Sequence, residues 1–187
     1  MVLAGPNGAG KSTTAARLLQ GALAVNEFVN ADTIALGLSA YRPETAAFTA
    51  GRVMLARLRQ LARAREDFAF ETTLAGRRYM RWLESLQAAG YRVHLAFVSL
   101  PSPNLAVARV AERVREGGHD VPEAVVRRRF TAGLNNLFAC YLQVVDSWQV
   151  YDNSEVAGPR VIAAKGAGKP EHIVDPAAWQ NLEGYKP

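Results

Sequence analysis

The feature that most constrains this chain is a glycine-rich segment close to its first residue. Residues 5–12, Gly-Pro-Asn-Gly-Ala-Gly-Lys-Ser, fit the pattern G-x-x-x-x-G-K-[ST]. Glycines let backbone N–H groups turn inward and approach phosphate oxygens closely, and a helix that starts near Lys11 adds the positive end of its dipole. A short apolar stretch, residues 2–4, precedes the segment. The pattern therefore predicts a phosphate-binding loop between a strand and a helix.

The polar residues of this loop have distinct expected tasks. Lys11 neutralises charge on the β- and γ-phosphates of a nucleotide, and Ser12 supplies a hydroxyl ligand to Mg²⁺. The residues that we expect to bind the nucleotide are Gly5, Pro6, Asn7, Gly8, Ala9, Gly10, Lys11, Ser12 and Thr13. The loop by itself does not indicate what happens to the bound phosphate.

The rest of the 187-residue chain alternates short β-rich stretches with helical ones, which predicts one α/β domain around a mostly parallel sheet. The stretch 92–100 is nearly continuously apolar, which predicts a central strand. Further strands are expected at 27–30, 68–71 and 149–152, the last at an edge, with a terminal hairpin at 161–164 and 172–174. Helices are expected at 11–19, 43–66, 77–89, 104–116 and 122–145. The tail, about 155–187, is predicted to be rich in loops because it is rich in Gly and Pro.

Composition excludes several classes of protein. The single cysteine, Cys140, rules out an intrachain disulfide framework and a Cys-rich zinc site, and favours a reducing, cytoplasmic location. No apolar run approaches the ~18 residues that cross a bilayer, so we expect no membrane partner. The formal charge of +5 indicates an acidic partner, either phosphorylated small molecules or nucleic acid.

Motifs that are missing from the sequence narrow the choice among phosphate-loop proteins. A transporter ATPase needs an LSGGQ-type signature and a strand that ends in Asp-Glu, and neither is present. A GTPase needs an Asn-Lys-x-Asp element, which is also missing. The class that remains is a small kinase.

Two polar groups follow predicted parallel strands, whose carboxyl ends face the ligand crevice. Asp32 follows the second strand, where its carboxylate can accept a proton from a substrate hydroxyl; it can equally well cap the next helix. Glu71, Thr72 and Thr73 end the third strand. Glu71 can position Mg²⁺ through water and the threonines can bind a phosphate or a substrate hydroxyl, although Thr is also simply a good strand former.

A basic cluster lies between residues 109 and 129. It comprises Arg109, Arg113, Arg115, Arg127, Arg128 and Arg129, with His119 between them and Gly117-Gly118 as a hinge. Arginines on a mobile segment can close over phosphates, whereas the alternative is a solvated helix face. Two further arginines are candidates for substrate contact. Arg52 begins a helical stretch that can face the crevice, and Arg77 precedes Trp82, which can border the substrate pocket.

The sequence resembles the zeta toxin family of phosphate-loop kinases over about residues 2–155. The matching segments are 3–13 (LAGPNGAGKST), 28–32 (FVNAD), 68–76 (FAFETTLAG), 113–122 (RVREGGHDVP), 127–130 (RRRF), 136–137 (NL) and 151–154 (YDNS). The resemblance implies a P-loop NTPase fold with an adenylate-kinase-like parallel sheet, in which the phosphate-loop strand lies beside the Glu71 strand. It also implies a helical, arginine-bearing lid at about 104–130.

The same resemblance implies a reaction and roles for residues. Zeta toxins use ATP and Mg²⁺ to phosphorylate a sugar hydroxyl of UDP-N-acetylglucosamine, and an antitoxin protein is a further possible partner. By motif match, Asp32 is the general base, Lys11 the phosphate lysine, and Glu71 with Thr72 lies at the substrate. Arg113 and Arg128, with Arg129, sense the phosphates. Asp152, Asn153 and Ser154 lie near the adenine.

Two other functions remain open from the sequence. The positive charge and the arginine cluster also suit a polynucleotide 5′-hydroxyl kinase or a repair ATPase, but no aromatic-rich basic platform accompanies them, so nucleic acid is the less favoured partner. The chain can also be a catalytically idle nucleotide-binding module held by an antitoxin. The complete set of Lys11, Asp32, Glu71 and arginines argues against this last function.

Overall fold

The computed structural model describes residues 1–20 and 25–187, and its centre is a seven-stranded sheet. The strands are β1 (Val2–Ala4), β2 (Glu27–Val29), β3 (Phe68–Thr72), β4 (His94–Ser99), β5 (Ser147–Asp152), β6 (Arg160–Lys165) and β7 (Glu171–Ile173). Their order is β2-β3-β1-β4-β5-β6-β7. The first five strands in this order are parallel, and β6 and β7 continue the sheet antiparallel. This is a P-loop NTPase-like fold with a mostly parallel sheet.

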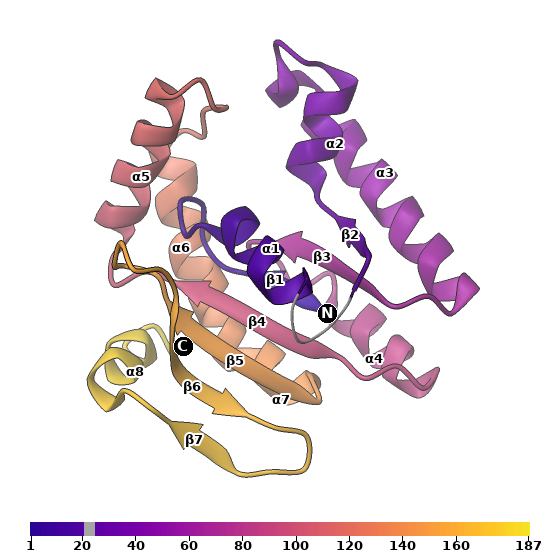
Figure 1. Ribbon diagram of the computed structural model, residues 1–187, viewed down its shortest axis with the longest axis vertical. Helices are drawn as coiled ribbons and strands as arrows, with labels where there is room; N and C mark the ends of the chain where they lie inside the picture. Colours follow the sequence, from indigo (N-terminus) through magenta and orange to yellow (C-terminus); the bar gives the residue numbers. More distant parts are fainter. Residues whose placement is uncertain (21–24) are drawn as a thin grey trace.

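Helices flank the sheet (Figure 1). They are α1 (Lys11–Gln20), α2 (Ala31–Leu38), α3 (Pro43–Ala64), α4 (Met80–Ala88), α5 (Pro103–Arg115), α6 (Glu123–Asn136), the π-helix Leu137–Tyr141, α7 (Leu142–Val144) and α8 (Pro176–Glu183). In Figure 1, α1 lies in front of the sheet, and α6 and α7 lie behind it. Two arms, α2–α3 and α5–α6, extend past the same end of the sheet, on either side of the segment that leads into α1.

Burial follows the apolar pattern of the sequence. Along α3, Ala50, Met54, Leu58 and Leu61 recur at helical spacing and are all buried, while arginines occupy the other faces. Strand β4 lies between β1 and β5 and is buried from its second residue onward, as its continuous apolar sequence predicts. The predicted neighbours β1 and β3 do pair in parallel, with Leu3 opposite Glu71.

Three expectations about the second half of the chain were wrong or incomplete. Strand β5 is not an edge strand, because β6 pairs with its outer side. The expected helix 122–145 is interrupted by the π-helix at Leu137–Tyr141. The tail contains the expected hairpin, β6 and β7, and also an unexpected helix α8, whose Trp179 stacks on Trp148 with ring centroids 5.7 Å apart. This aromatic contact packs α8 against β5, the strand that carries Trp148.

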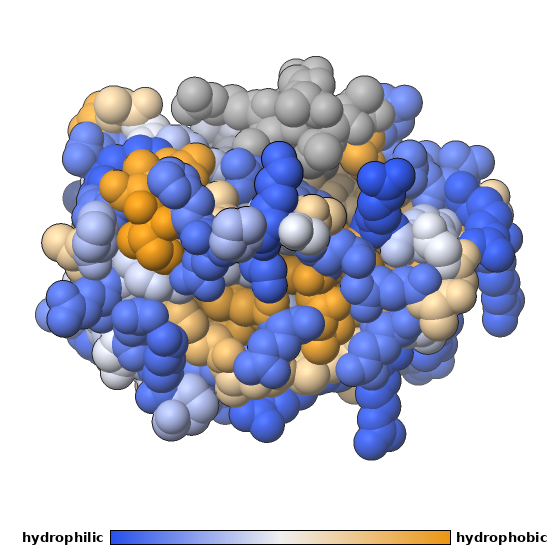
Figure 2. Space-filling model, turned by 90° about the horizontal axis from the view of Figure 1, so that it is seen from below, coloured by the Kyte–Doolittle hydropathy of each residue, from blue (hydrophilic) through white to orange (hydrophobic). Residues whose placement is uncertain are grey.

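The face in Figure 2 is the end of the molecule away from the two arms, and it shows hydrophilic residues around a smaller group of hydrophobic ones. Within the part of the chain that the structure describes, no helix is long and apolar enough to cross a membrane.

Candidate active site

The candidate residues meet because their strands run in the same direction. Strands β1, β2, β3 and β5 are all parallel to one another, so their carboxyl ends share one edge of the sheet. The phosphate loop follows β1, Asp32 follows β2, Glu71 and Thr72 end β3, and Asp152 ends β5. The sequence therefore places four separate segments around one crevice.

The phosphate loop is closely packed against its neighbours, which explains two of its glycines. A Cβ on Gly5 would lie 2.1 Å from the Val98 carbonyl oxygen of β4. A Cβ on Gly10, where φ is +77°, would lie 2.6 Å from the Asn153 side-chain nitrogen. Lys11 is buried, and its Nζ donates to the Pro6 carbonyl at 3.0 Å, so the lysine folds back over the loop.

Glu71 connects the loop to the neighbouring strands. Its Oε1 lies 3.4 Å from Lys11 Nζ, and its Oε2 accepts from Ser12 Oγ at 2.9 Å and from Asn30 Nδ2 at 2.8 Å. Burial lowers the pKa of Lys11, and the Glu71 and Asp32 carboxylates oppose that shift. The hydroxyl of Ser12 and the carboxylate of Glu71 are adjacent hard oxygen donors, which suit Mg²⁺ held mainly by water and phosphate oxygens.

The structure identifies Asn30, not Asp32, as the cap of α2. Asn30 Oδ1 accepts from the backbone N–H groups of Asp32 and Thr33, at 2.7 and 3.3 Å. Asp32 lies in the first turn of α2, and its side chain is 58% exposed. The alternative in which Asp32 caps the helix is therefore wrong, and its carboxylate is free to face the crevice.

Two cavities meet at Asp32. One, which we name the Ser12 cavity, has a volume of about 530 Å³ and is lined by Ser12, Asn30, Asp32, Arg113 and the turn between α5 and α6. The other, the Arg52 cavity, has about 560 Å³ and lies between α3 and the same turn; its lining includes Arg52, Phe48, Arg78 and Arg129. Asp32, Pro43, Glu44, His119 and Asp120 line both cavities. Asp32 therefore lies between a space beside the phosphate loop and a second space of similar size.

The predicted arginines divide into inward and outward ones. Arg113 lines the Ser12 cavity, and its buried Nε has no hydrogen-bond partner in residues 1–20 and 25–187. Arg129 Nη1 donates to Asn7 Oδ1 at 3.3 Å; burial lowers its pKa, and Asp32 opposes the shift. Arg128 is exposed and forms no hydrogen bond or ion pair within the described residues. Of the two adjacent arginines, the one that faces the loop is therefore Arg129.

The remaining predicted substrate residues are dispersed. Thr72 and Thr73 are half-buried, and Thr72 Oγ1 accepts from the backbone N–H of Leu74. Arg77 lines neither cavity and donates from Nε to Asn136 Oδ1 at 2.9 Å. Arg52 is exposed and lines the cavity that bears its name.

The segment that follows β5 contacts the phosphate loop. Asn153 Nδ2 donates to the Ala9 carbonyl at 2.8 Å. Asp152 binds the Ser154 backbone and hydroxyl and is paired with Arg160 at 2.9 Å, so it is committed to structural contacts. Arg109 donates to the carbonyls of Asn153 and Ser154 at 2.6 and 3.0 Å, and thus ties α5 to this segment.

Sequence reasoning did not identify the contacts by which three residues hold this site together. These residues are Asn30, Asn136 and Arg109, the last of which was considered only as a member of the basic cluster. An Asn directly before the first residue of a helix is typical of an N-cap, so the sequence did contain a signal for Asn30. Arg109 had no signal that separated it from the other arginines. Asn136 is buried and its Nδ2 donates to the Leu74 carbonyl at 2.8 Å, a partner that is 62 residues away in the sequence.

Comparison with known proteins identifies the family. The model of a family described as "AAA domain" matches residues 1–133, well over half of the chain. The chain belongs to this AAA domain family. An uncharacterized protein of Haemophilus influenzae is 29% identical over 126 residues, which are 67% of this chain and 88% of that protein.

Solved structures give the same fold at low sequence identity. The complex of AvrRxo1-ORF1 and -ORF2 with ATP matches with a TM-score of 0.73 at 16% identity; the match covers 97% of this chain and 62% of the other. The chain therefore spans less than two thirds of that protein. A structure of the PezAT chromosomal toxin-antitoxin system of Streptococcus pneumoniae matches with a TM-score of 0.66 at 14% identity, over 99% of this chain and 77% of the other. The family shown is thus the AAA domain family, and likeness to toxin proteins is a likeness of fold.

Proposed function

We propose that this member of the AAA domain family is an ATP-dependent small-molecule kinase of zeta toxin type. It transfers the γ-phosphoryl group to a hydroxyl group of a nucleotide sugar such as UDP-N-acetylglucosamine. The observation that carries the proposal is the position of Asp32, whose carboxylate is free of its own helix and lies between the two cavities. A carboxylate opposite a phosphate loop is the group that an alcohol needs in order to attack a phosphoryl group.

The chemistry assigns one task to each group. The acceptor hydroxyl in the Arg52 cavity gives its proton to Asp32 while its oxygen forms a bond to the γ-phosphorus, and the bond from that phosphorus to the β–γ bridging oxygen breaks, which releases ADP. Lys11, Arg113 and Arg129 balance the negative charge on the transferred group. Ser12, with Glu71 through water, would hold Mg²⁺, which when bound neutralises charge on the phosphates.

The lining of the Arg52 cavity combines charged and apolar groups. Arg52, Arg78 and Arg129 supply positive charge there, and Phe48, Leu55 and Val125 supply apolar surface. The carboxylates of Asp32, Glu44 and Asp120 line the same cavity, so the arginines are the groups in it that suit a diphosphate. A nucleotide sugar combines a diphosphate with a planar base and a hydroxylated ring, and so uses both kinds of surface.

The test is an acceptor panel. The protein is incubated with Mg²⁺, ATP and either single nucleotide sugars or an oligonucleotide with a free 5′-hydroxyl, and products are identified by mass spectrometry. We expect a phosphorylated nucleotide sugar. We also expect Asp32→Asn to lose about 100-fold or more of the rate while its affinity for ATP is retained. Glu84→Gln, at an exposed carboxylate on α4, is the matched control and retains the full rate.

The outcomes separate the candidates. Phosphorylation of the oligonucleotide alone would replace the proposal with a polynucleotide kinase. Tight ATP binding with no product from any acceptor would indicate an idle binding module. A wild-type rate in Asp32→Asn would show that Asp32 is not the base.

A further inference from the structure

One contact between an imidazole and a carboxylate joins the two arms across the crevice. Among the contacts between acidic and basic side chains in the described residues, 1–20 and 25–187, the one between His119 and Asp32 links the α5–α6 turn, residues 116–122, to α2. His119 Nε2 lies 3.8 Å from Asp32 Oδ2. Both residues line both cavities.

The backbone of His119 is held in place by the end of α5. Arg113 Nη2 donates to the His119 carbonyl at 3.0 Å, and the Gly118 N–H donates to the Arg113 carbonyl at 2.9 Å. Gly117 has a φ of +89°, and a Cβ on Gly118 would lie 2.6 Å from Arg113 Cγ. The two glycines therefore let the turn wrap around Arg113, an arrangement that directs the imidazole toward α2.

Asp32 lacks any other fixed contact for its side chain. Its carboxylate makes no hydrogen bond within the described residues. A general base must present one oxygen in a defined direction, and displacement by about 1 Å can cost ~100-fold in rate. An additional group is therefore needed to orient this carboxylate.

Two of the cations near Asp32 have partners elsewhere: Lys11 is bonded to Pro6 and paired with Glu71, and Arg129 donates to Asn7. Arg113 donates to the His119 carbonyl, and Arg52 lines the Arg52 cavity without a hydrogen bond or ion pair in the described residues. The imidazole of His119 makes no other hydrogen bond in the part of the chain that the structure describes. Two acidic residues, Glu44 and Asp120, line the same cavities and are the other groups that an imidazole can reach there.

We infer that His119 is a positioning residue for Asp32, an inference that rests on the proposed function. The present 3.8 Å separation exceeds a charge-assisted N–H···O distance of about 2.8 Å by about 1 Å. A movement of the α5–α6 turn by that amount, over bound nucleotide, brings His119 Nε2–H into a hydrogen bond with Asp32 Oδ2. Oδ1 is then left to accept the proton of the acceptor hydroxyl, and the imidazole keeps its own proton throughout. The arm that carries Arg113 to the phosphates thus also orients the base.

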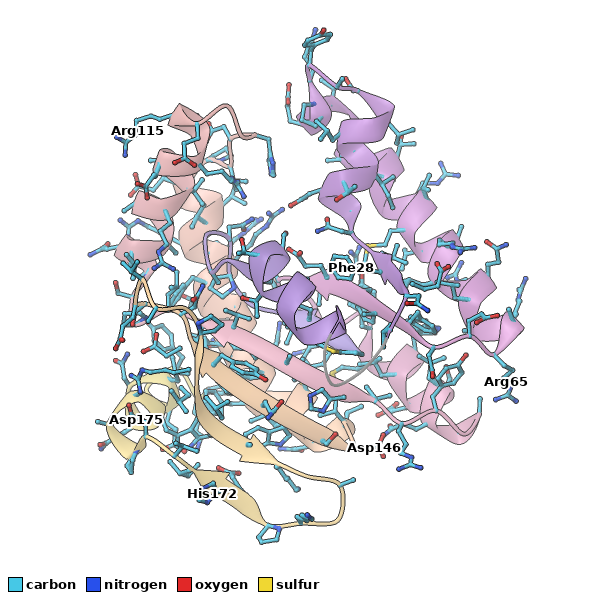
Figure 3. All side chains as sticks on the ribbon, viewed as in Figure 1. Phe28, Arg65, Arg115, Asp146, His172 and Asp175 are labelled. Carbon is cyan, nitrogen blue, oxygen red and sulfur yellow. The ribbon has the colours of Figure 1, made fainter. Side chains whose placement is uncertain are left out.

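The first experiment measures the contact without any acceptor. The chain has three histidines, so the imidazole ¹⁵N signals can be assigned with single His→Gln variants. We expect the His119 signals to shift between wild type and Asp32→Asn at one fixed pH, with Mg²⁺ and a non-hydrolysable ATP analogue bound. The internal controls, His94 on β4 and His172 on β7, lie outside both cavities and should not move (Figure 3 labels His172). Unchanged His119 signals overturn the inference whatever the activity of the protein.

The second experiment measures the rate with an acceptor from the panel. We expect His119→Ala to lower kcat ~10- to 100-fold with the KM for ATP within about twofold of wild type. His119→Gln keeps an N–H donor near the Nε2 position and should recover most of the loss, whereas His172→Ala should have the wild-type rate. In the Asp32→Asn background, loss of His119 should have no further effect, because the two groups act as a pair.

The outcomes distinguish the inference from the proposed function. A wild-type kcat in His119→Ala, in a protein that phosphorylates an acceptor, overturns the positioning role alone. Equal losses in His119→Ala and His119→Gln overturn it as well, because the donor would then be irrelevant. If the His119 signals shift but the protein phosphorylates no acceptor, the contact exists and the proposed function is refuted. The positioning role, which rests on that function, is then refuted with it.

Discussion

Replacement of Asn136 by alanine is expected to destabilise the protein by about 2 kcal/mol. Asn136 is 8% exposed and holds the loop after β3 from the end of α6. Its Nδ2 donates to the carbonyl of Leu74, a residue that is fully buried. Loss of this donor leaves a buried carbonyl without a partner, which costs about 1–3 kcal/mol. The second bond, from exposed Arg77 to Asn136 Oδ1, adds little because water can replace it.

The assay is thermal and urea-induced unfolding of the full chain. For a domain of this size, about 2 kcal/mol corresponds to a fall in Tm of roughly 4–8 °C. The matched control is Asn104→Ala, because Asn104 is also bonded to an arginine, Arg127, but is exposed. The control should lose under about 0.5 kcal/mol. If both variants lost the same amount, the buried bond to Leu74 would not be what holds this loop.

Two further substitutions test other contacts. Arg109→Ala removes the bonds that hold the segment after β5, and this segment contacts the phosphate loop through Asn153. The Kd for ATP, measured by calorimetry, should therefore rise by up to about tenfold, which is about 1.4 kcal/mol. Arg127→Ala is the control and should leave this Kd unchanged. Burial raises the pKa of Tyr141 to about 12, so the folded state favours the neutral phenol. The stability that the neutral phenol contributes is complete below about pH 10 and is lost as the pH rises toward 12. The Tm advantage of wild type over Tyr141→Phe, which also lacks the bond to Gly76, should therefore shrink over that range; a constant difference would contradict this sign.

The parts of the site that were predictable are those that depend on neighbours in the sequence. The phosphate loop was identified because its glycines, lysine and serine must follow one another. Asp32 and Glu71 were placed at one edge of the sheet because parallel strands align their carboxyl ends, and in the structure both carboxylates act on Lys11. Contacts at long sequence separation, such as Asn136 with Leu74, had no counterpart in any local pattern.

Ambiguities between adjacent residues needed the structure. Arg128 and Arg129 are equivalent in sequence, but the rotation of α6 about its own axis directs only Arg129 toward the loop. Whether Asp32 caps α2 depended on where that helix begins, and the structure places Asn30 at the cap. The π-helix at Leu137–Tyr141 depended on packing, since Tyr141 reaches Gly76 from within it.

Local chemistry by itself determined that this chain binds phosphate at its amino end and alternates strands with helices, because backbone conformation and the spacing of apolar residues are encoded over a few positions. The tertiary structure decided which carboxylate is free, which arginine faces the loop, and that His119 meets Asp32 across the crevice. These last features depend on the packing of whole helices against the sheet. That packing is fixed by the sum of many buried contacts and is not encoded in any single motif.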